Sequence, residues 1–302
     1  MRIGIIGMGW VGTSVAISTL HSGLARELLL YDVKTELAEG EAMDLAHGSS
    51  FYSRASVRVA SMREMRDCDA VVIAAGRGGN AKQTRLQLLQ DNAQIMRDIA
   101  RELEGCRGIV IVVTNPVDVL TRVVQQESGL PPARVIGTGT MLDTARLRHT
   151  LGDLLELEPR SIHANVIGEH GDSEVVLFSC AQVGGRPLRD WPDWSPDREA
   201  DIVTEVRRAA YEIIRRKGAT NHAIGLVTTA LMRWALRGER RVLTVSRVQE
   251  GACGLHGVAL SLPTIVGADG ATEVIVPNMD RAEHEGLLRS AEVLESAWRE
   301  LT

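Results

Sequence analysis

The chain has 302 residues, of which 44% are hydrophobic and 24% are charged, and its formal net charge is −5. This length can bury a large core and is at the upper end for one domain, so we expect two lobes. Ten aromatic side chains are too few for a base-stacking surface, and the mildly acidic charge argues against nucleic-acid binding. Because 31 of the 34 basic residues are arginines, a bias that genomic base composition explains, a single Arg is weak evidence for an anion site.

The cysteines and the hydropathy pattern indicate the compartment. The four cysteines are far apart and form no CxxC pair, which argues against a disulfide framework or a thiolate zinc site: Cys68, Cys106, Cys180 and Cys253. No apolar run approaches the roughly 20 residues that span a bilayer, and glycines interrupt the N-terminal apolar run too early for a signal peptide. We therefore expect a cytoplasmic protein with no membrane partner.

The first half alternates short apolar runs with longer helical patterns. We predict strands at residues 2–6, 27–31, 57–60, 69–74, 109–113 and 134–136. Helical periodicity lies between them at residues 11–22, 35–46, 84–104 and 117–128. Several strands are almost continuous in Val, Ile and Leu, as in parallel strands that are covered on both faces. The pattern predicts an α/β fold with a doubly wound parallel sheet, known as a Rossmann fold.

The second half has a different pattern. We predict strands at residues 161–167, 174–183, 241–247, 256–265 and 272–276, and helices at residues 197–216 and 221–236. A final amphipathic helix carries Leu287, Ala291 and Leu294 on one face. We expect residues 1–143 to form a dinucleotide-binding domain and residues 144–302 a mixed α+β substrate domain, with a cleft between them.

A glycine-rich turn follows the first predicted strand and opens a helix, with the sequence Gly7-Met-Gly9-Trp-Val-Gly12. Gly7 permits the tight turn, Gly9 lets a pyrophosphate approach the backbone, and Gly12 allows close packing of helix and strand. The helix N-terminus adds free N–H groups and a positive dipole end. The alternative is a glycine-rich turn without a ligand.

Asp32 adds a second cofactor signal, because it lies 20 residues after Gly12 at the end of the second predicted strand. An acidic side chain there accepts hydrogen bonds from ribose hydroxyls and repels a 2′-phosphate, which favours NAD over NADP. Lys34 lies nearby and could accommodate a phosphate, but Asp32 occupies the position at the strand end.

Three further residues form a candidate catalytic group. His170 lies between glycines in Gly168-Glu-His-Gly-Asp-Ser173, where small neighbours let a substrate reach the imidazole. Asp143 and Arg146 are three residues apart, a spacing that places them on one face of a helix. From spacing alone, an ordinary salt bridge explains the Asp143–Arg146 pair equally well. A metal site at His163, Glu169 and His170 is a further alternative, but adjacent residues rarely converge on one ion.

Ordered motifs along nearly the whole chain resemble the lactate/malate dehydrogenase family of NAD-dependent 2-hydroxy acid dehydrogenases. Beyond the residues above, the matching segments are Gly40-Glu-Ala-Met-Asp-Leu45, Thr84-Arg-Leu86, Thr114-Asn-Pro-Val-Asp118, Val135-Ile-Gly-Thr-Gly139, Leu142-Asp-Thr-Ala-Arg146, Lys217-Gly-Ala-Thr220 and Ser261-Leu-Pro263. The resemblance makes chance spacing a negligible explanation. It implies a small 2-oxo or 2-hydroxy acid as the substrate and a homo-oligomer, either a dimer or a tetramer.

The resemblance also implies roles for individual residues. His170 would exchange a proton with the substrate oxygen, and Asp143 would orient the imidazole and stabilise its charged form. Arg146 would hold the substrate carboxylate with two parallel hydrogen bonds, and Arg85, in a glycine-rich loop that acts as a lid, would polarise the carbonyl. Asn115 and Thr220 would form polar walls near the nicotinamide and the substrate, and Ile224 would pack against the nicotinamide ring.

Substrate choice is where the sequence departs from the family. Six positions before the lid arginine, lactate enzymes have Gln and malate enzymes have Arg, whereas this chain has Gly79. The missing Arg argues against a second substrate carboxylate, so we expect L-lactate and pyruvate. Malate, bulkier 2-oxo acids and a non-catalytic NAD-binding protein are the alternatives. Arg148 and His163 resemble an allosteric anion site, for which a bound anion or a subunit contact is the other explanation.

Overall fold

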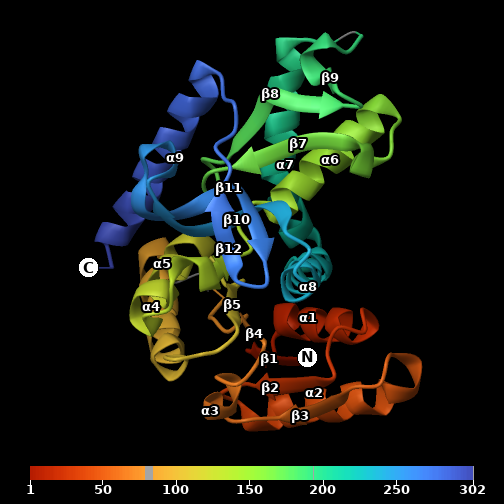
Figure 1. Ribbon diagram of the computed structural model, residues 1–302, viewed down its shortest axis with the longest axis vertical. Coiled ribbons are helices and arrows are strands. Elements are labelled where there is room, and N and C mark those ends of the chain that lie inside the picture. The colour runs from red at the N-terminus through yellow and green to blue at the C-terminus, as the bar shows by residue number, and fades with distance from the viewer. Residues whose placement is uncertain (79–83, 193, 302) are drawn as a thin grey trace.

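The computed structural model describes residues 1–78, 84–192 and 194–301. Its first half alternates strands and helices in the predicted order (Figure 1). These elements are β1 (Arg2–Ile6), α1 (Trp10–His21), β2 (Glu27–Tyr31), α2 (Thr35–His47), β3 (Ser56–Val59), α3 (Met62–Met65), β4 (Ala70–Ile73), α4 (Arg85–Glu102), β5 (Ile109–Val112), α5 (Val117–Ser128) and β6 (Val135–Gly137).

Strands β1–β6 form a parallel sheet in the order β3-β2-β1-β4-β5-β6. This is the strand order of a doubly wound dinucleotide-binding sheet, which confirms the predicted fold class. The order reverses between β1 and β4, and ligands of such sheets bind outside the carboxyl ends of the strands at that reversal. The glycine-rich turn after β1 lies at this point.

The second half contains a smaller sheet and three strands that join the first sheet. Its elements are α6 (Met141–Leu155), β7 (Ile162–Ile167), β8 (Val175–Val183), β9 (Arg186–Pro187), α7 (Pro196–Lys217), α8 (His222–Leu236), β10 (Arg241–Glu250), β11 (His256–Gly267), β12 (Gly270–Val274) and α9 (Arg281–Arg299). Strands β7, β8 and β9 form the separate sheet, whereas β10, β11 and β12 extend the first sheet beyond β6.

This extension connects the two halves of the chain. β10 pairs antiparallel with β6 through Ser246 and Gly137, so one nine-stranded sheet runs through both lobes. Figure 1 shows β10 and β11 between the N-terminal strands and the β7–β9 sheet. The expected boundary between residues 1–143 and 144–302 falls inside α6, and the division into two domains stays a prediction.

Apolar clusters cover both faces of the sheet. Alternate residues of β4 and β5 belong to different clusters, with Val71 and Val110 on one face and Val72 and Ile111 on the other. Burial on both faces explains why these strands are continuously apolar in sequence. A third cluster joins α6, α7 and the small sheet. Within the described residues, no helix has the length and apolarity needed to cross a membrane.

Candidate active site

The glycine-rich turn has the geometry that a phosphate-binding turn requires. Gly7 has a φ of +96°, and a Cβ atom there would lie 2.4 Å from the Ala75 nitrogen. A Cβ at Gly12 would lie 1.8 Å from the Gly7 carbonyl oxygen, so only glycine lets α1 approach the turn this closely. A Cβ at Gly9 would meet no atom within 4 Å, which leaves the backbone at the start of α1 open to a ligand.

Asp32 follows β2, and its carboxylate holds the glycine-rich turn in place. Its Oδ2 accepts a hydrogen bond of 2.8 Å from the Met8 amide, and its Oδ1 accepts one of 2.9 Å from the Lys34 amide. A carboxylate has further lone pairs, so Asp32 retains the capacity to accept from ribose hydroxyls. Asp32, Gly7 and Gly9 line one cavity of about 750 Å³ at the carboxyl ends of β1 and β2.

A second cavity of about 420 Å³ continues from the first, and both include Ala74, Gly76 and Arg77 in their walls. It is lined by residues from both halves of the chain, including Asn115, Arg146, His170, Thr220 and Ile224. An elongated cleft with an open turn at one end and an acidic strand end beside it fits a dinucleotide. The residues present therefore fit NAD.

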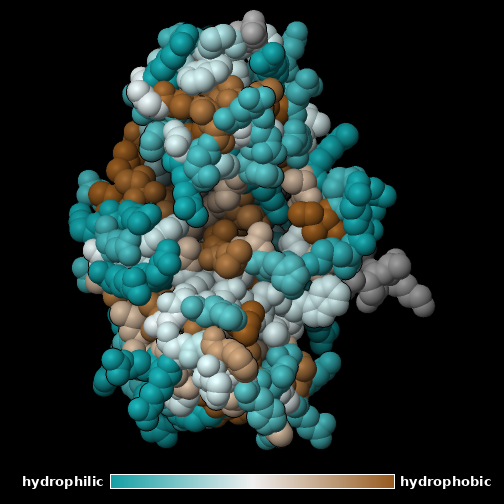
Figure 2. Space-filling view, turned by 90° about the vertical axis from the view of Figure 1, so that its right-hand side faces the viewer, coloured by the Kyte–Doolittle hydropathy of each residue, from teal (hydrophilic) through white to brown (hydrophobic). Residues whose placement is uncertain are grey.

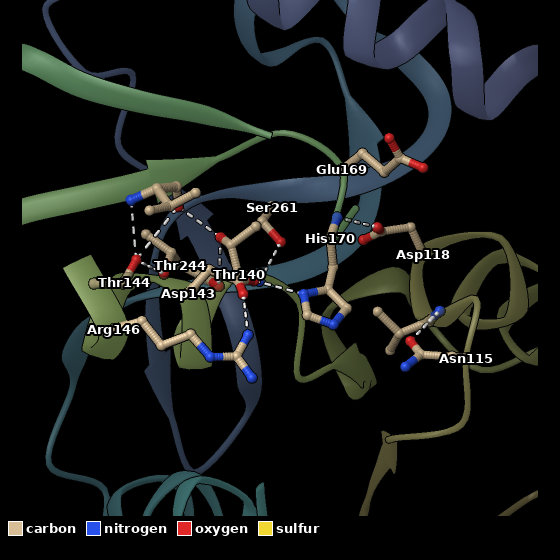
Figure 3. Close-up of polar contacts among 12 residues, drawn as sticks. Asn115, Asp118, Thr140, Asp143, Thr144, Arg146, Glu169, His170, Thr244 and Ser261 are labelled. Carbon is tan, nitrogen blue, oxygen red and sulfur yellow. Dashed lines mark hydrogen bonds and ion pairs between the residues drawn. The ribbon is translucent and has the colours of Figure 1, made fainter. Parts of the chain in front are cut away.

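The Asp143 carboxylate bonds both of the other predicted catalytic residues, His170 and Arg146. Asp143 Oδ2 lies 2.5 Å from His170 Nδ1, and Asp143 Oδ1 accepts a hydrogen bond of 2.7 Å from the Arg146 guanidinium. The Asp143 side chain is 4% exposed, whereas His170 is 25% exposed and Arg146 is 14% exposed. Figure 3 shows the second imidazole nitrogen on the side of the ring away from Asp143. The ion pair between Asp143 and Arg146 is thus part of a larger group that faces the cavity.

Electrostatics around His170 favour the charged imidazole. Burial lowers the pKa of His170, but the nearby Asp143 carboxylate outweighs this effect, and the pKa rises to about 9. Burial also raises the pKa of Asp143, but His170 and Arg146 outweigh it and hold that pKa below its usual value. At neutral pH the site therefore contains an imidazolium beside a carboxylate, and the imidazolium can donate a proton.

Threonine hydroxyls fix the start of α6, and with it Asp143, against the small sheet. Thr140 Oγ1 donates to the Val166 carbonyl at 2.6 Å, and the Val166 amide donates to Thr144 Oγ1 at 3.0 Å. Thr144 Oγ1 also lies 3.0 Å from Thr244 Oγ1 on β10 (Figure 3). These bonds hold the helix that carries Asp143 against β7, the strand that leads to His170.

The sequence predicts Arg85 both at the end of a glycine-rich lid loop and inside a helix at residues 84–104. The structure has it in the helix: Arg85 is the first residue of α4, where Thr84 caps the helix and the Gln87 amide donates to Thr84 Oγ1 at 3.1 Å. Arg85 is exposed and lines a third cavity together with Asn115, Asp143, Arg146 and His170. Gly79 lies outside the described residues, so its predicted place in the substrate pocket stays a prediction.

Two buried carboxyl groups near His170 were not predicted. Asp118 on α5 accepts a hydrogen bond of 2.7 Å from the His170 amide, and burial raises its pKa to about 6. Glu174 lines the third cavity, and burial together with the Asp143 charge raises its pKa to about 8. Asp118 belongs to the quoted segment Thr114–Asp118, which was the one available signal. Nothing in the sequence around Glu174 indicates burial.

The candidate anion site consists of Arg148 and His163. Arg148 donates to the Ala164 carbonyl at 3.0 Å and to Asn165 Oδ1 at 3.2 Å, and it lines a separate cavity with Arg160. His163 is exposed on β7 and does not line that cavity. An allosteric role for these two residues stays a prediction. Among the described residues, no group of three His, Cys, Asp or Glu side chains is placed to hold a metal ion.

The fold and the site define a class of protein: an NAD-dependent dehydrogenase. Two family models match the chain. The lactate/malate dehydrogenase NAD-binding domain matches residues 1–137, and the α/β C-terminal domain of the same enzymes matches residues 140–302. The chain belongs to the lactate/malate dehydrogenase family, and it is an NAD-dependent 2-hydroxy acid dehydrogenase.

Relatives and solved structures agree over the whole chain. An L-lactate dehydrogenase of Salinibacter ruber is 42% identical over 307 residues, covering 99% of this chain and 97% of the relative. One of Thermus aquaticus is 42% identical, with 98% of each chain covered. A crystal structure of minor L-lactate dehydrogenase from Enterococcus mundtii, in a ligands-bound form, has a TM-score of 0.97 and 39% identity, and covers 100% of this chain and 98% of that one.

Proposed function

We propose that this enzyme interconverts pyruvate and L-lactate. The observation that carries the proposal is that His170 and Arg146 both bond the Asp143 carboxylate and both line one cavity, which supports His170 as proton donor and Arg146 as carboxylate anchor. A 2-oxo acid presents a carbonyl oxygen next to a carboxylate and so matches this pair. The relatives named L-lactate dehydrogenase support pyruvate as the particular acid.

The chain's own residues perform the following steps in the proposed reduction. Arg146 and the substrate carboxylate pair through two parallel hydrogen bonds, which sets the orientation of the substrate. NAD, when bound, supplies the hydride in its reduced form and takes it back in the reverse reaction. His170 Nε2 donates its proton to the carbonyl oxygen, while Asp143 stabilises the imidazolium and keeps Nδ1 protonated.

Other residues complete the site in this proposal. Arg85 would polarise the carbonyl, Asn115 and Thr220 would form polar walls, and Ile224 would pack on the nicotinamide ring. Gly7, Gly9 and Gly12 in the glycine-rich turn would hold the phosphates, and Asp32 would hold the ribose hydroxyls.

A kinetic panel tests the substrate. Pyruvate, oxaloacetate and 2-oxoisocaproate are each reduced with NADH, and kcat/KM is compared. We expect the highest value for pyruvate, because Arg146 can anchor one carboxylate and the sequence has Gly79 where malate enzymes have an Arg for a second one. A higher kcat/KM for oxaloacetate would identify a malate enzyme, and a higher value for 2-oxoisocaproate would identify an enzyme for bulkier acids. Either result overturns the choice of pyruvate.

Asp143 should set the pH range of the reduction. The charged imidazole is the proton donor, so in the unaltered enzyme kcat/KM for pyruvate should hold through neutral pH and fall as pH rises through about 9. Asp143→Asn keeps the shape of the side chain but removes the charge that raises the pKa of His170. The fall should then begin at a lower pH.

A matched control lies on the same helix, where His149 Nε2 and Asp153 Oδ2 form an exposed pair 3.6 Å apart. Asp153→Asn should leave the pH profile unchanged. If Asp143→Asn and the unaltered enzyme lose activity over the same pH range, then Asp143 does not tune His170.

We also propose that the chain works as a homo-oligomer in the cytoplasm, either as a dimer or as a tetramer. Figure 2 shows apolar side chains gathered at mid-height on the face that is at the right-hand side of Figure 1. Large apolar side chains on α8 and at the start of β10 are exposed, with Leu226 at 64% and Val242 at 52%. Exposed apolar surface of this kind supports a contact with a second copy.

A further inference from the structure

The turn that carries His170 is held by three elements that are far apart in the sequence. Its first three amides in succession each have a different partner. The Gly168 amide donates to the Ser261 carbonyl on β11 at 2.8 Å. The Glu169 amide donates to Ser290 Oγ on α9 at 2.6 Å, and the His170 amide donates to Asp118 Oδ2 on α5 at 2.7 Å. The path of the backbone into His170 is therefore fixed at every residue.

The turn packs closely against α9. Gly168 has a φ of +85°, and a Cβ atom there would lie 2.7 Å from Ser290 Oγ and 3.2 Å from Ser290 Cβ. The backbone of the turn thus lies directly against the helix, and the serine hydroxyl fills the space between them. Glycine at position 168 lets the two approach, and serine at position 290 joins them.

Ser173, at the other end of the turn, contacts the same Ser290 hydroxyl. Ser173 Oγ lies 3.2 Å from Ser290 Oγ and donates a short hydrogen bond to the Glu169 carboxylate. The Ser173 amide donates to that carboxylate at 3.2 Å. Ser290 therefore contacts both ends of the turn, with His170 between them.

The position of Ser290 on its helix is informative. Leu287, Ala291 and Leu294 form the buried stripe of α9 and belong to the main apolar cluster, and Ser290, which is 0% exposed, lies in the same stripe. A hydroxyl in an apolar stripe costs stability unless it is hydrogen-bonded. Here the partners of the Ser290 hydroxyl are the Glu169 amide and Ser173, both in the turn that carries His170. The hydroxyl therefore stabilises that turn rather than its own helix.

We propose that Ser290 is a positioning residue for His170: its hydroxyl fixes the Gly168–Ser173 turn so that the imidazole remains on Asp143 and within reach of the substrate carbonyl. The C-terminal helix thereby takes part in the reaction without contacting substrate or cofactor. The effect on turnover rests on the proposed reduction of a 2-oxo acid, whereas the effect on the His170 side chain does not.

The test compares Ser290→Ala with Ser296→Ala, which alters an exposed serine on the same helix. Ser290→Ala should lower kcat for pyruvate roughly tenfold or more, because small displacements of a catalytic group are costly. The affinity for NADH, measured by fluorescence titration, should stay nearly constant because the cofactor cleft is untouched. Ser296→Ala should match the unaltered enzyme in both measurements.

A second readout follows the imidazole directly. The His170 resonance in ¹⁵N-histidine NMR is assigned by its loss in His170→Asn, and its titration midpoint is measured. Ser290→Ala should lower the titration midpoint of His170, because the imidazole of a loosened turn spends less time bonded to the Asp143 carboxylate. If Ser290→Ala destabilises the protein without changing kcat or the midpoint, Ser290 is merely structural and the proposal is wrong.

A third variant covers the case in which Ser290→Ala does not fold. Ser290→Cys keeps a side chain of similar shape with a weaker acceptor, so it should show a smaller change in the same direction. An unchanged midpoint in Ser290→Cys would also overturn the proposal. If the unaltered enzyme shows no activity on pyruvate, the proposed substrate is wrong, and the NMR midpoint still decides the role of Ser290.

Discussion

Replacing His170 with asparagine should lower kcat for pyruvate reduction on the order of 10³-fold, because the site loses its proton donor. Asparagine still offers an N–H group to Asp143 but has no proton to give at neutral pH. NADH affinity should be nearly unchanged, since the glycine-rich turn and Asp32 lie in a cavity that His170 does not line, and of the two cavities of the cofactor cleft His170 lines only the one proposed for the nicotinamide. Steady-state kinetics and fluorescence titration of NADH measure the two effects separately.

The control for this prediction is His149→Asn. His149 forms the same kind of pair with Asp153 but is exposed on the outer face of α6, so its loss should leave kcat unchanged. If His170→Asn retains the turnover of the unaltered enzyme, another group donates the proton and the proposed mechanism is wrong. Retained NADH binding in an inactive variant would separate a catalytic loss from a folding defect.

Arg146→Lys should raise the KM for pyruvate and lower kcat/KM by roughly 100-fold. Arginine can bond Asp143 with one nitrogen and still offer two parallel donors to a substrate carboxylate, whereas an ammonium group cannot reproduce that geometry. The loss of one hydrogen bond to a charged group costs about 1.5–3 kcal/mol, and tenfold in binding corresponds to about 1.4 kcal/mol. Kinetics with varied pyruvate at saturating NADH provide the measurement.

A matched substitution for comparison is Arg107→Lys, at an exposed residue far from the cleft, whose side chain lies 3.8 Å from Asp67. It should leave KM unchanged. Equal KM values for Arg146→Lys and the unaltered enzyme would show that the substrate carboxylate binds elsewhere.

Local signals in the sequence are sufficient to predict most of the N-terminal sheet. The buried strands β4 and β5 are continuous apolar runs, and α5 has the predicted bounds because Pro116 precedes it and Gly129, with a φ of +64°, ends it. The spacing of Asp143 and Arg146 likewise predicts their shared helix face. In each case the information lies within a few neighbouring residues.

Long-range contacts were not predictable in this way. No pattern in β10 indicates that Ser246 pairs with Gly137, because an apolar strand can join either sheet. Asp118 and Ser290 reach the His170 turn across 52 and 121 residues, and a buried polar side chain has no sequence signature until its partner is known. Local sequence signals therefore predict the residues that line the cavity more readily than the residues that hold them in place.

The single carboxylate shared by His170 and Arg146 has a consequence for regiochemistry. Because Arg146 bonds one oxygen of Asp143 and His170 bonds the other, we expect little variation in the separation between the proposed carboxylate anchor and the proposed proton donor. A 2-oxo acid has its carbonyl next to the carboxylate, whereas in a 3-oxo acid the carbonyl lies one carbon farther away, so we expect 3-oxo acids to be poor substrates. Different pockets can accept different side chains on the acid, but the expected position of the carbonyl, next to the carboxylate, stays the same.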